Sequence, residues 1–586
     1  MTITDPKAPS ATAPGANAQL DADAKKNLDA IIAKLAGNEK SFAAMSVTDR
    51  AELLGRVHAS VADSAAEWVD AASRIKGLDA DSRYVGEEWT SGLYAVLAAA
   101  AMLRQTLLAI AGGKSPLAGK KFGRAPGNRV SVPVLPSTAQ ESILFSGFRT
   151  EVWMPPGVGA DTVKASAGLG ELNPTETDGV GLVLGAGNVT SIPPLDVFYE
   201  LFANNRISLL KLNPVLAGVE AAYRKGLAPL IEAGLLEIVQ GGGEVGSYLA
   251  HHAGISHVHI TGSAATHDVV VWGPGQEGRD RKKAGTPLLK KPITSELGGV
   301  SPIIVVPGNW SKADLTFQAE HVATQRLHNG GYNCIAGQIV VLSSDWAQRD
   351  AFVAELRAAL DRAPVRPAWY PGSDDRVSAA MKSYPNSEHH GSDTRLLVDI
   401  AADDDASTLQ TTEYFSPVLG VVEVSGTGIE FFSKAVDTVN SDFLGTLGAN
   451  VLIDPSTRKK LGPAFMEQIA KLRYGTIAIN TWTAFGYLTP GAPWGGFPGA
   501  SLTDVQSGIG VVHNALLIDG AERTVTYGPF RPFPRSFAGG EAAMFPKPPW
   551  FVTARSAAKT GKLLVNYAKK PSWLRMPAVF GSAFKA

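Results

Sequence analysis

The clearest chemical signal in the chain is a single cysteine. Cys334 is the only cysteine among 586 residues, and it ends the run Asn-Gly-Gly-Tyr-Asn-Cys that begins at Asn329. Without a partner the thiol can form neither an intramolecular disulfide nor a thiolate metal site by itself, so it is either a buried inert group or a nucleophile. The glycines and asparagines beside it favour a turn whose backbone N–H groups approach a ligand, and therefore the nucleophile.

A carboxylate upstream supplies the second half of a covalent reaction. Glu296 precedes Leu-Gly-Gly and an apolar run over 303–306. A thiol that attacks carbon and a carboxylate that activates water are the two groups needed for acyl chemistry. The alternative for Glu296 is an ordinary buried salt-bridge carboxylate, which the glycines after it make less favourable.

This pair resembles the two signature motifs of the aldehyde dehydrogenase superfamily, Glu-Leu-Gly-Gly and Asn-x-Gly-x-x-Cys. The two residues stand 38 positions apart (334 − 296), in the family's order, and the likeness extends over about 179–525. The resemblance implies that Cys334 attacks an aldehyde and that a hydride then leaves for NAD or NADP. Water deprotonated by Glu296 would hydrolyse the resulting thioester.

The resemblance also assigns further site residues. Asn188 aligns with the asparagine whose amide forms an oxyanion hole together with the backbone N–H of the nucleophile; a turn-forming asparagine is the alternative. Cofactor contacts are expected from five residues: Lys211 at the adenosine ribose, Gly262 and Ser263 at the pyrophosphate, Glu413 at the nicotinamide ribose and Phe415 beside the nicotinamide ring.

Several positions depart from the family pattern. Pro214 stands where the family has a ribose-binding glutamate, so the choice between NAD and NADP remains open. His267 replaces a glycine, Val300 replaces a lysine, and 272–287 is a Gly-rich, charged insertion. Beside Asn188, Ala186 and Gly187 replace a proline and a tryptophan, which leaves that wall of the pocket uncertain. The chain is a divergent member by these criteria.

The elements that must position these residues form an α/β pattern. Apolar strand-like segments at 180–184, 207–212, 237–240 and 258–261 alternate with helix-like segments, among them 193–204 and 217–233. Strands separated by helices of this length predict a parallel sheet covered on both faces, which is a Rossmann-type cofactor domain. A second α/β unit begins at Glu296, and a helical layer precedes both.

The predicted organisation has five parts, two of them discontinuous. They are a disordered tail (1–25), a dinucleotide-binding domain (26–113 and 179–295), a β oligomerisation arm (114–178 and 505–528), a catalytic domain (296–504) and a basic-aromatic C-terminal extension (529–586). The family resemblance implies that the arm pairs with another subunit. Its low apolar content agrees, so we predict a homo-dimer or homo-tetramer.

Composition is that of a soluble intracellular protein. The chain has 54 basic and 55 acidic residues, which shows no nucleic-acid signature, and no metal-ligand spacing stands out. The first residues lack the basic start and apolar core of a signal peptide, and the longest apolar stretch, 93–103, is too short to span a bilayer and predicts a buried helix. A cytoplasmic location follows.

The C-terminal extension is the feature that the family does not explain. Residues 531–586 hold ten basic residues against one acid, Glu541, interleaved with aromatic residues and a helix-like segment at 552–568. This composition suits an interfacial segment on anionic lipid. The alternative is a tail packed on the enzyme or on a neighbouring subunit. We predict peripheral membrane contact, with an extension that does not complete the fold.

The leading function is NAD(P)-dependent oxidation of an aldehyde to a carboxylic acid. A CoA-acylating reaction is an alternative, although it would not need Glu296 to activate water. A catalytically silent scaffold would have lost the nucleophile or the base, and both are present. The sequence does not identify the aldehyde, although the apolar residues of the extension suggest a hydrophobic one.

Overall fold

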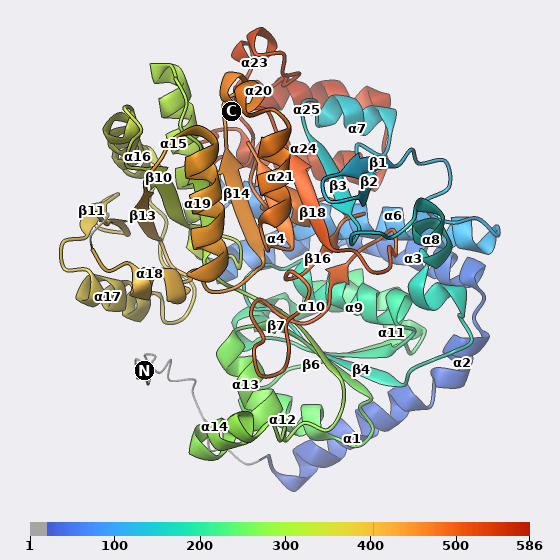
Figure 1. Cartoon of the computed structure of the whole chain (residues 1–586). Helices are drawn as coiled ribbons and strands as arrows, with labels where there is room; N and C mark the ends of the chain where they lie inside the picture. Colours follow the sequence, from blue (N-terminus) through green and yellow to red (C-terminus); the bar gives the residue numbers. More distant parts are fainter. Residues whose placement is uncertain (1–19, 402–403) are drawn as a thin grey trace.

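The computed structural model describes residues 20–401 and 404–586, which form two large sheets with helices packed around them (Figure 1). A five-stranded sheet lies in the lower half of the view and an eleven-stranded sheet in the upper half. The predicted α/β fold is confirmed. Most of the predicted disordered tail lies outside the described residues, but its last part does not: helix α1 begins at Ala22, capped by the Asp21 side chain.

The N-terminal layer is helical, as predicted. It contains α1 (Ala22–Ala36), α2 (Glu39–Ala44), α3 (Val47–Asp63), α4 (Ala65–Ile75) and one long helix made of α5 (Val85–Glu87), the π-helix η1 (Glu88–Tyr94) and α6 (Ala95–Ala111). Helix α1 packs on β4, β5 and β6, so this layer covers the smaller sheet.

The long helix Val85–Ala111 is the one helix of the described residues that is long and apolar enough to cross a membrane by length and composition, with a mean hydropathy of 1.7. More than half of it is buried, and α6 packs along α3. Leu97, Ala100 and Leu107 are fully shielded from solvent. The predicted buried helix is therefore confirmed, and it runs on at both ends beyond the predicted stretch.

The smaller sheet is wholly parallel, with the strand order β6-β5-β4-β7-β8. Its strands are β4 (Val180–Leu184), β5 (Ile207–Lys211), β6 (Leu236–Val239), β7 (His257–Gly262) and β8 (Ile293–Leu297). The connecting helices are α8 (Ala160–Ser166), η2 (Leu169–Leu172), α9 (Ile192–Ala203), η3 (Pro214–Val219), α10 (Glu220–Gly226), α11 (Ala228–Glu232), α12 (Gly243–His251), α13 (Ala264–Trp272) and α14 (Gly275–Ala284). All four predicted strands are present to within one or two residues.

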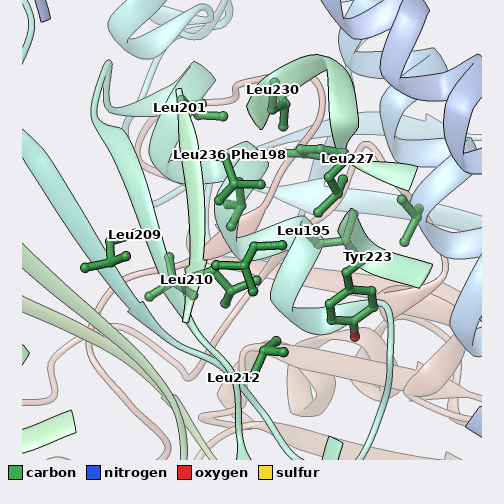
Figure 2. Close-up of a cluster of buried hydrophobic side chains, with 14 of the residues drawn as sticks. Leu195, Phe198, Leu201, Leu209, Leu210, Leu212, Tyr223, Leu227, Leu230 and Leu236 are labelled. Atoms are coloured by element: carbon green, nitrogen blue, oxygen red, sulfur yellow. The ribbon is translucent and has the colours of Figure 1, made fainter. Parts of the chain in front are cut away.

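Apolar side chains from α9, α10, α11, β5 and β6 form the core on one face of this sheet (Figure 2). Leu195 and Phe198 of α9 face Leu210 of β5, and each fully buried leucine of this kind contributes roughly 2 kcal/mol. The predicted helical segment 217–233 is present, but it is divided among η3, α10 and α11. Gly226 ends α10 and Pro229 lies in the first turn of α11, where its missing N–H does no harm.

The larger sheet has the order β1-β2-β3-β18-β15-β14-β9-β10-β13-β12-β11. From β18 to β12 the strands are parallel: β18 (Arg523–Tyr527), β15 (Thr476–Ile479), β14 (Gly448–Leu452), β9 (Ser301–Val305), β10 (Gly337–Ser343), β13 (Val418–Val424) and β12 (Arg395–Asp399). Antiparallel strands complete both edges: β11 (Glu388–His390) on one side, and β1 (Gly123–Ala125), β2 (Arg129–Leu135) and β3 (Arg149–Trp153) on the other.

Helices cover both faces of the larger sheet (Figure 1). They are α15 (Lys312–Leu327), α16 (Arg349–Arg362), α17 (Ser373–Ser383), α18 (Ser407–Thr411), α19 (Gly428–Ser441), α20 (Pro455–Leu461) and α21 (Pro463–Lys471). A separate two-stranded ribbon pairs β16 (Pro493–Trp494) with β17 (Val512–His513). The short helices η4 (His328–Gly331) and α22 (Ala484–Tyr487) border the region between the two sheets.

The predicted arm joins the larger sheet of its own chain. Strand β3 pairs with β18, and its register aligns Trp153 with Arg523. Val132, Val152 and Met154 pack with Leu516 into a small apolar core. The argument that the arm lacks apolar residues for a core is therefore wrong. The oligomeric state itself remains a prediction.

The C-terminal extension is folded onto the rest of the chain. It contains α23 (Arg535–Ala538), α24 (Ala557–Lys569), η5 (Trp573–Arg575) and α25 (Met576–Ala583), and Figure 1 shows α24 and α25 beside α7 (Ala139–Leu144). Helix α24 lies so close to α5 that a Cβ on Gly86 would come within 2.5 Å of the Ala557 backbone. The expectation that this segment does not complete the fold is therefore wrong, because its aromatic and aliphatic side chains pack against the body. Membrane contact stays a prediction.

Candidate active site

The loop that carries Cys334 has an unusual backbone. It follows the buried helix α15, and Asn329, Gly330 and Gly331 adopt φ angles of 56°, 73° and 84°. Such angles are costly for most residues and easy for glycine. A Cβ on Gly330 would meet the ring of Tyr332 at 2.6 Å. The glycines of the motif are therefore needed for the tight turn that delivers the thiol.

Buried polar contacts hold this turn in place. The Asn329 side-chain amide donates to the carbonyl oxygens of Asn188 (3.1 Å) and Tyr332 (3.2 Å). The Lys76 ammonium donates to Asn329 Oδ1 at 2.9 Å and pairs with Glu88 at 2.6 Å. Because these groups are shielded from water, each contact is directional and costly to lose.

A second ion pair supports the same turn. Glu87, which comes from the long N-terminal helix like Glu88, accepts from the Asn329 backbone N–H (3.2 Å) and from Arg366 (2.6 Å). The π-helix η1 begins directly after it, and a π-helical turn is a feature that occurs frequently at functional sites. The N-terminal layer therefore fixes the geometry of the nucleophile loop.

Glu296 lies next to the thiol. It is at the carboxyl end of β8, only 3% exposed, and its carboxylate is close enough to the Cys334 thiol for each group to shift the pKa of the other. The indole N–H of Trp494 donates to Glu296 Oε1 at 3.2 Å. Burial raises the pKa of Glu296 to about 7, and burial together with the neighbouring Glu296 raises the pKa of the Cys334 thiol well above its usual range. The Cys334 thiol is therefore protonated at neutral pH.

Asn188 lies on the other side of Cys334. It follows β4, donates from Nδ2 to the Tyr332 carbonyl at 2.9 Å and is 7% exposed. It lines the same cavity as Cys334. The space left by Gly187 is taken by the Asn213 side chain, which a Cβ there would meet at 2.7 Å. The structure thus brings Asn188, Cys334 and Glu296 together, although their roles remain predictions.

The cavity at Cys334 has a volume of about 140 Å³, counted as the space open to the centre of a water molecule. Its walls come from η1, the arm, the end of β4, the nucleophile loop, the segment 481–494 and the C-terminal extension. Apolar and aromatic side chains predominate among the lining residues. This is the expected form of a small-molecule site.

Glu413 and Phe415 lie near the nucleophile loop. The Glu413 carboxylate lies against the backbone of Gly298, where a Cβ would meet its Oε1 at 2.0 Å. Burial raises the pKa of Glu413 to about 8, and its Oε1 is out of solvent contact without a hydrogen-bond partner among the described residues. Phe415 packs against Tyr370 (5.0 Å) and Tyr332 (6.1 Å between ring centroids).

Lys211, Gly262 and Ser263 lie at the carboxyl edge of the smaller sheet. Lys211 ends β5 and Gly262 ends β7, on opposite sides of β4, where the strand order reverses. Ligands of open parallel sheets bind at this kind of position. Gly262 is exposed, and a Cβ there would make only ordinary contact with Ile260 at 3.8 Å. The Ser263 hydroxyl caps α13 by accepting from the Thr266 N–H (3.1 Å).

These residues fit a nicotinamide dinucleotide in one specific respect. The unpartnered Glu413 Oε1 can accept a hydrogen bond from a ribose hydroxyl beside the glycines of the Glu296 motif, and the edge at Gly262 is open to a phosphate. Lys211 is largely buried, and burial lowers the pKa of its ammonium.

Sequence reasoning missed three aromatic residues of the site. Trp494 binds Glu296, and Tyr487 and Trp550 line the cavity. The Pro-Trp-Gly-Gly run containing Trp494 echoes a family segment, so a signal existed. Tyr487 had none. Trp550 belongs to the extension, whose aromatic residues were interpreted as a membrane signal.

Comparisons with known proteins agree with this geometry. The model of the aldehyde dehydrogenase family matches residues 219–377, a range that holds both Glu296 and Cys334. The γ-glutamyl-γ-aminobutyraldehyde dehydrogenase of Burkholderia cenocepacia is 20% identical, with a TM-score of 0.57 over 87% of this chain and 89% of that chain.

Two further solved structures share the fold. A putative aldehyde dehydrogenase of Burkholderia cenocepacia is 22% identical, with a TM-score of 0.56 over 86% of this chain and 92% of that chain. Aldehyde dehydrogenase C of Pseudomonas syringae, solved with NAD+ and octanal, is 18% identical, with a TM-score of 0.57 over 87% and 90%. Both motifs thus lie inside the range that matches the aldehyde dehydrogenase family, and the chain shares the fold of solved aldehyde dehydrogenases along most of its length.

Proposed function

We propose that this protein oxidises an aldehyde to a carboxylic acid with NAD or NADP, through a thiohemiacetal and a thioester on Cys334. The observation that carries the proposal is the buried Glu296 carboxylate next to the Cys334 thiol, beside a cavity that both Cys334 and Asn188 line. A thiol, a base with a pKa of about 7 and an amide donor are the groups that this chemistry needs.

The first half of the reaction forms a bond to sulfur. Glu296 takes the thiol proton, and the sulfur of Cys334 attacks the aldehyde carbon. The carbonyl oxygen becomes an oxyanion, stabilised by Asn188 Nδ2 and the backbone N–H of Cys334. Glu413 would hold the ribose of a bound NAD or NADP, which would supply the acceptor for the hydride of the thiohemiacetal. Cys334 then carries a thioester.

The second half releases the acid. Glu296, after losing its proton to solvent, removes a proton from water, and the resulting hydroxide attacks the thioester carbon. The carbon–sulfur bond breaks, the acid leaves, and the proton returns to sulfur. Burial near Trp494 keeps Glu296 at a pKa close to neutral pH, where a base both accepts and releases protons.

A nicotinamide cofactor has independent support from the fold. Solved structures with the same fold include PnpE in complex with nicotinamide adenine dinucleotide and 3,6-anhydro-L-galactose dehydrogenase in complex with NADP. The test is direct: reduced cofactor is followed at 340 nm with NAD and NADP separately, and the same pair is compared in Glu413→Gln. Loss of cofactor affinity in this variant would support the assignment of Glu413.

The roles of Cys334 and Glu296 are separated by a burst experiment. Glu296→Gln should form one reduced cofactor per active site, more slowly than the unsubstituted protein, and then stall at the thioester. If coenzyme A were required for turnover of the unsubstituted protein and water did not suffice, the CoA-acylating alternative would be correct. The absence of any reduced cofactor with all aldehydes would favour a silent scaffold.

We also propose a cytoplasmic homo-oligomer with peripheral membrane contact. Trp573 and Leu574 are 53% and 91% exposed, and they lie between Lys569, Lys570 and Arg575. Each basic residue near an anionic leaflet contributes about 1 kcal/mol, and exposed apolar side chains add to this. Phosphatidylserine vesicles should retain the protein, and the double variant Trp573→Ser with Leu574→Ser should lose this binding. Ile143→Ser, at an exposed position of the arm, is the control.

The oligomeric state is tested by sedimentation. The arm's antiparallel strands end at the short edge strand β1, and an edge strand offers unpaired backbone groups to another chain. A dimer or tetramer at micromolar concentration is expected. A monomer at that concentration would end this proposal.

A further inference from the structure

The C-terminal extension forms part of the wall around Cys334. Phe545, Pro549, Trp550, Thr560, Leu564, Val579 and Ala583 line the cavity that contains the thiol. Trp550 packs into the same apolar cluster as Cys334 and Trp482. A segment more than 200 residues from the nucleophile therefore shapes the space in which the substrate must lie.

Aromatic contacts hold this wall in position. The indole of Trp550 lies 5.4 Å from the ring of Phe148 and 5.7 Å from that of Phe485, and these two rings stack at 4.6 Å. On its other side the extension is anchored by Phe551, which stacks on Phe317 at 5.3 Å. The wall is thus a packed layer that joins the arm, the segment 481–494 and the extension.

The cavity offers no fixed positive charge for a charged substrate group. Among the described residues that line it, none is Lys or Arg. Glu141 is engaged by the Ser137 N–H and hydroxyl, and burial lowers the pKa of His328, which stays neutral at neutral pH. A carboxylate on the substrate would lose its hydration here without an ionic partner.

The volume sets the length of the substrate. An apolar cavity of roughly 150 Å³ holds a benzene-sized molecule, so about 140 Å³ accommodates on the order of six to ten non-hydrogen atoms. An aldehyde of about this size would therefore fill the cavity.

We infer that the extension is a specificity-determining wall and that the substrate is an uncharged, largely hydrocarbon aldehyde of medium chain length or with an aromatic ring. This inference rests on the proposed function, because it takes Cys334 as the attacking group. It goes further by assigning Leu564, Val579 and Ala583 as residues that limit the length of the substrate.

A chain-length series tests the substrate class. With straight-chain aldehydes from three to fourteen carbons, kcat/KM should rise about fourfold per methylene until the cavity is full, which corresponds to ~0.8 kcal/mol per buried methylene. Succinic semialdehyde should be a poor substrate. Equal kcat/KM from three to ten carbons would overturn the inference.

Aromatic walls also bind quaternary ammonium groups, so a cationic aldehyde is the decisive competitor. Trimethylammonioacetaldehyde should react at least tenfold less efficiently than hexanal. If it is preferred, the aromatic wall is a cation site and the hydrocarbon inference is wrong. The same two classes of aldehyde can be compared without turnover. Binding of octanal and of the cationic aldehyde to the Cys334→Ala variant is measured by thermal shift.

A matched pair of variants tests the extension itself. Ala583 lines the cavity and is 1% exposed, whereas Ala578 lies on the same helix, α25, and faces solvent. Ala583→Leu adds three carbons to the cavity, so kcat/KM for decanal should fall more than tenfold while that for propanal stays within threefold. Ala578→Leu should change neither. Equal loss for both aldehydes in Ala583→Leu, with an unchanged circular dichroism spectrum, would contradict a role in length selection.

Trp550→Leu covers the case in which Ala583→Leu does not fold. It removes volume from the wall, so the preferred chain length should increase by two or more carbons. An unchanged optimum in a folded Trp550→Leu protein would overturn the inference. If no aldehyde of any length yields reduced cofactor, the proposed function fails. Turnover of propanal without a chain-length dependence means that only the substrate inference fails.

Discussion

The two sides of the cavity around Cys334 are built differently. On one side, hydrogen bonds and buried ion pairs fix the nucleophile loop, with Lys76 and Arg366 at its base. On the other side, aromatic and aliphatic contacts of Trp550 and its neighbours form the wall. Directional polar contacts fix atoms to within tenths of an ångström, whereas apolar packing tolerates changes of shape.

Because of this difference, the loop side should determine the rate of the reaction and the wall should determine which aldehyde is accepted. A small shift of the loop would misplace the thiol relative to Glu296 and Asn188, and such misplacement lowers the rate steeply. A change in the wall alters which aldehyde fits while the reacting groups stay in place. Substitutions on the loop side should therefore reduce turnover of every aldehyde, and substitutions in the wall should affect aldehydes selectively.

The largest effect is expected at the nucleophile. Cys334→Ala should reduce turnover by a factor on the order of 10⁵ or more, because no other group can form the thioester. The loss should be the same for propanal and decanal in steady-state assays of reduced cofactor. Residual turnover within a hundredfold of the unsubstituted protein would show that Cys334 is not the attacking group, and unchanged thermal unfolding serves as the control for folding.

Removal of the oxyanion donor should have the second largest effect. Asn188→Ala should lower kcat by about 10²–10³-fold, since one preorganised donor is lost where charge develops. Stopped-flow measurement of the hydride step, with cofactor affinity as the control, checks this. A loss of only twofold would make Asn188 a turn residue that merely binds the Tyr332 carbonyl.

A pH dependence from Glu296 should follow. Burial raises its pKa from the ordinary carboxylate range to about 7, so the neutral form predominates below pH 7 and the basic form above it. Because the base must be ionised to accept a proton, kcat/KM should fall about tenfold per pH unit below 7 and level off above it. The profile is measured from pH 5 to 9. A flat profile would remove Glu296 as the base, and Glu296→Gln should lack this limb.

The sequence predicted the loop side well and the wall poorly, for physical reasons. Glycines at positive φ, a lone cysteine and a carboxylate before two glycines are local requirements, so they are visible in a short motif. Strands such as Val180–Leu184 could be predicted for the same reason, because a short apolar run in the sequence indicates them. The wall arises from contacts between segments hundreds of residues apart, and no local pattern shows that Trp550 meets Phe148. The arm was similarly hard to predict, because β3 pairs with the distant β18.

The smallest effect on the chemistry is expected where the extension is anchored by charge. The Arg531 guanidinium donates twice to the Asp314 carboxylate, at 2.9 Å from both Nε and Nη2, and Arg535 binds the same carboxylate. Arg531→Met should lower the free energy of unfolding by about 1–3 kcal/mol, because a largely buried acid loses its paired donors while Arg535 remains.

The matched control is Arg555→Met, at an exposed position of the same extension, which should stay within about 0.5 kcal/mol. Burial alone would raise the pKa of Asp314, but hydrogen bonds from Arg531 and Ser311 outweigh it and hold the pKa below the usual value. The stabilisation is therefore present at neutral pH and is lost only as pH falls through that depressed pKa, so the difference between the variants should be constant from pH 6 to 8. Urea unfolding at pH 6, 7 and 8 measures this difference in the free energy of unfolding.

Turnover of propanal by Arg531→Met should stay within twofold, since the nucleophile loop does not depend on this anchor. A loss as large as that of Asn188→Ala would show that the extension also holds the reacting groups. The division of the cavity into one side that sets the chemistry and one that sets the selectivity would then be wrong.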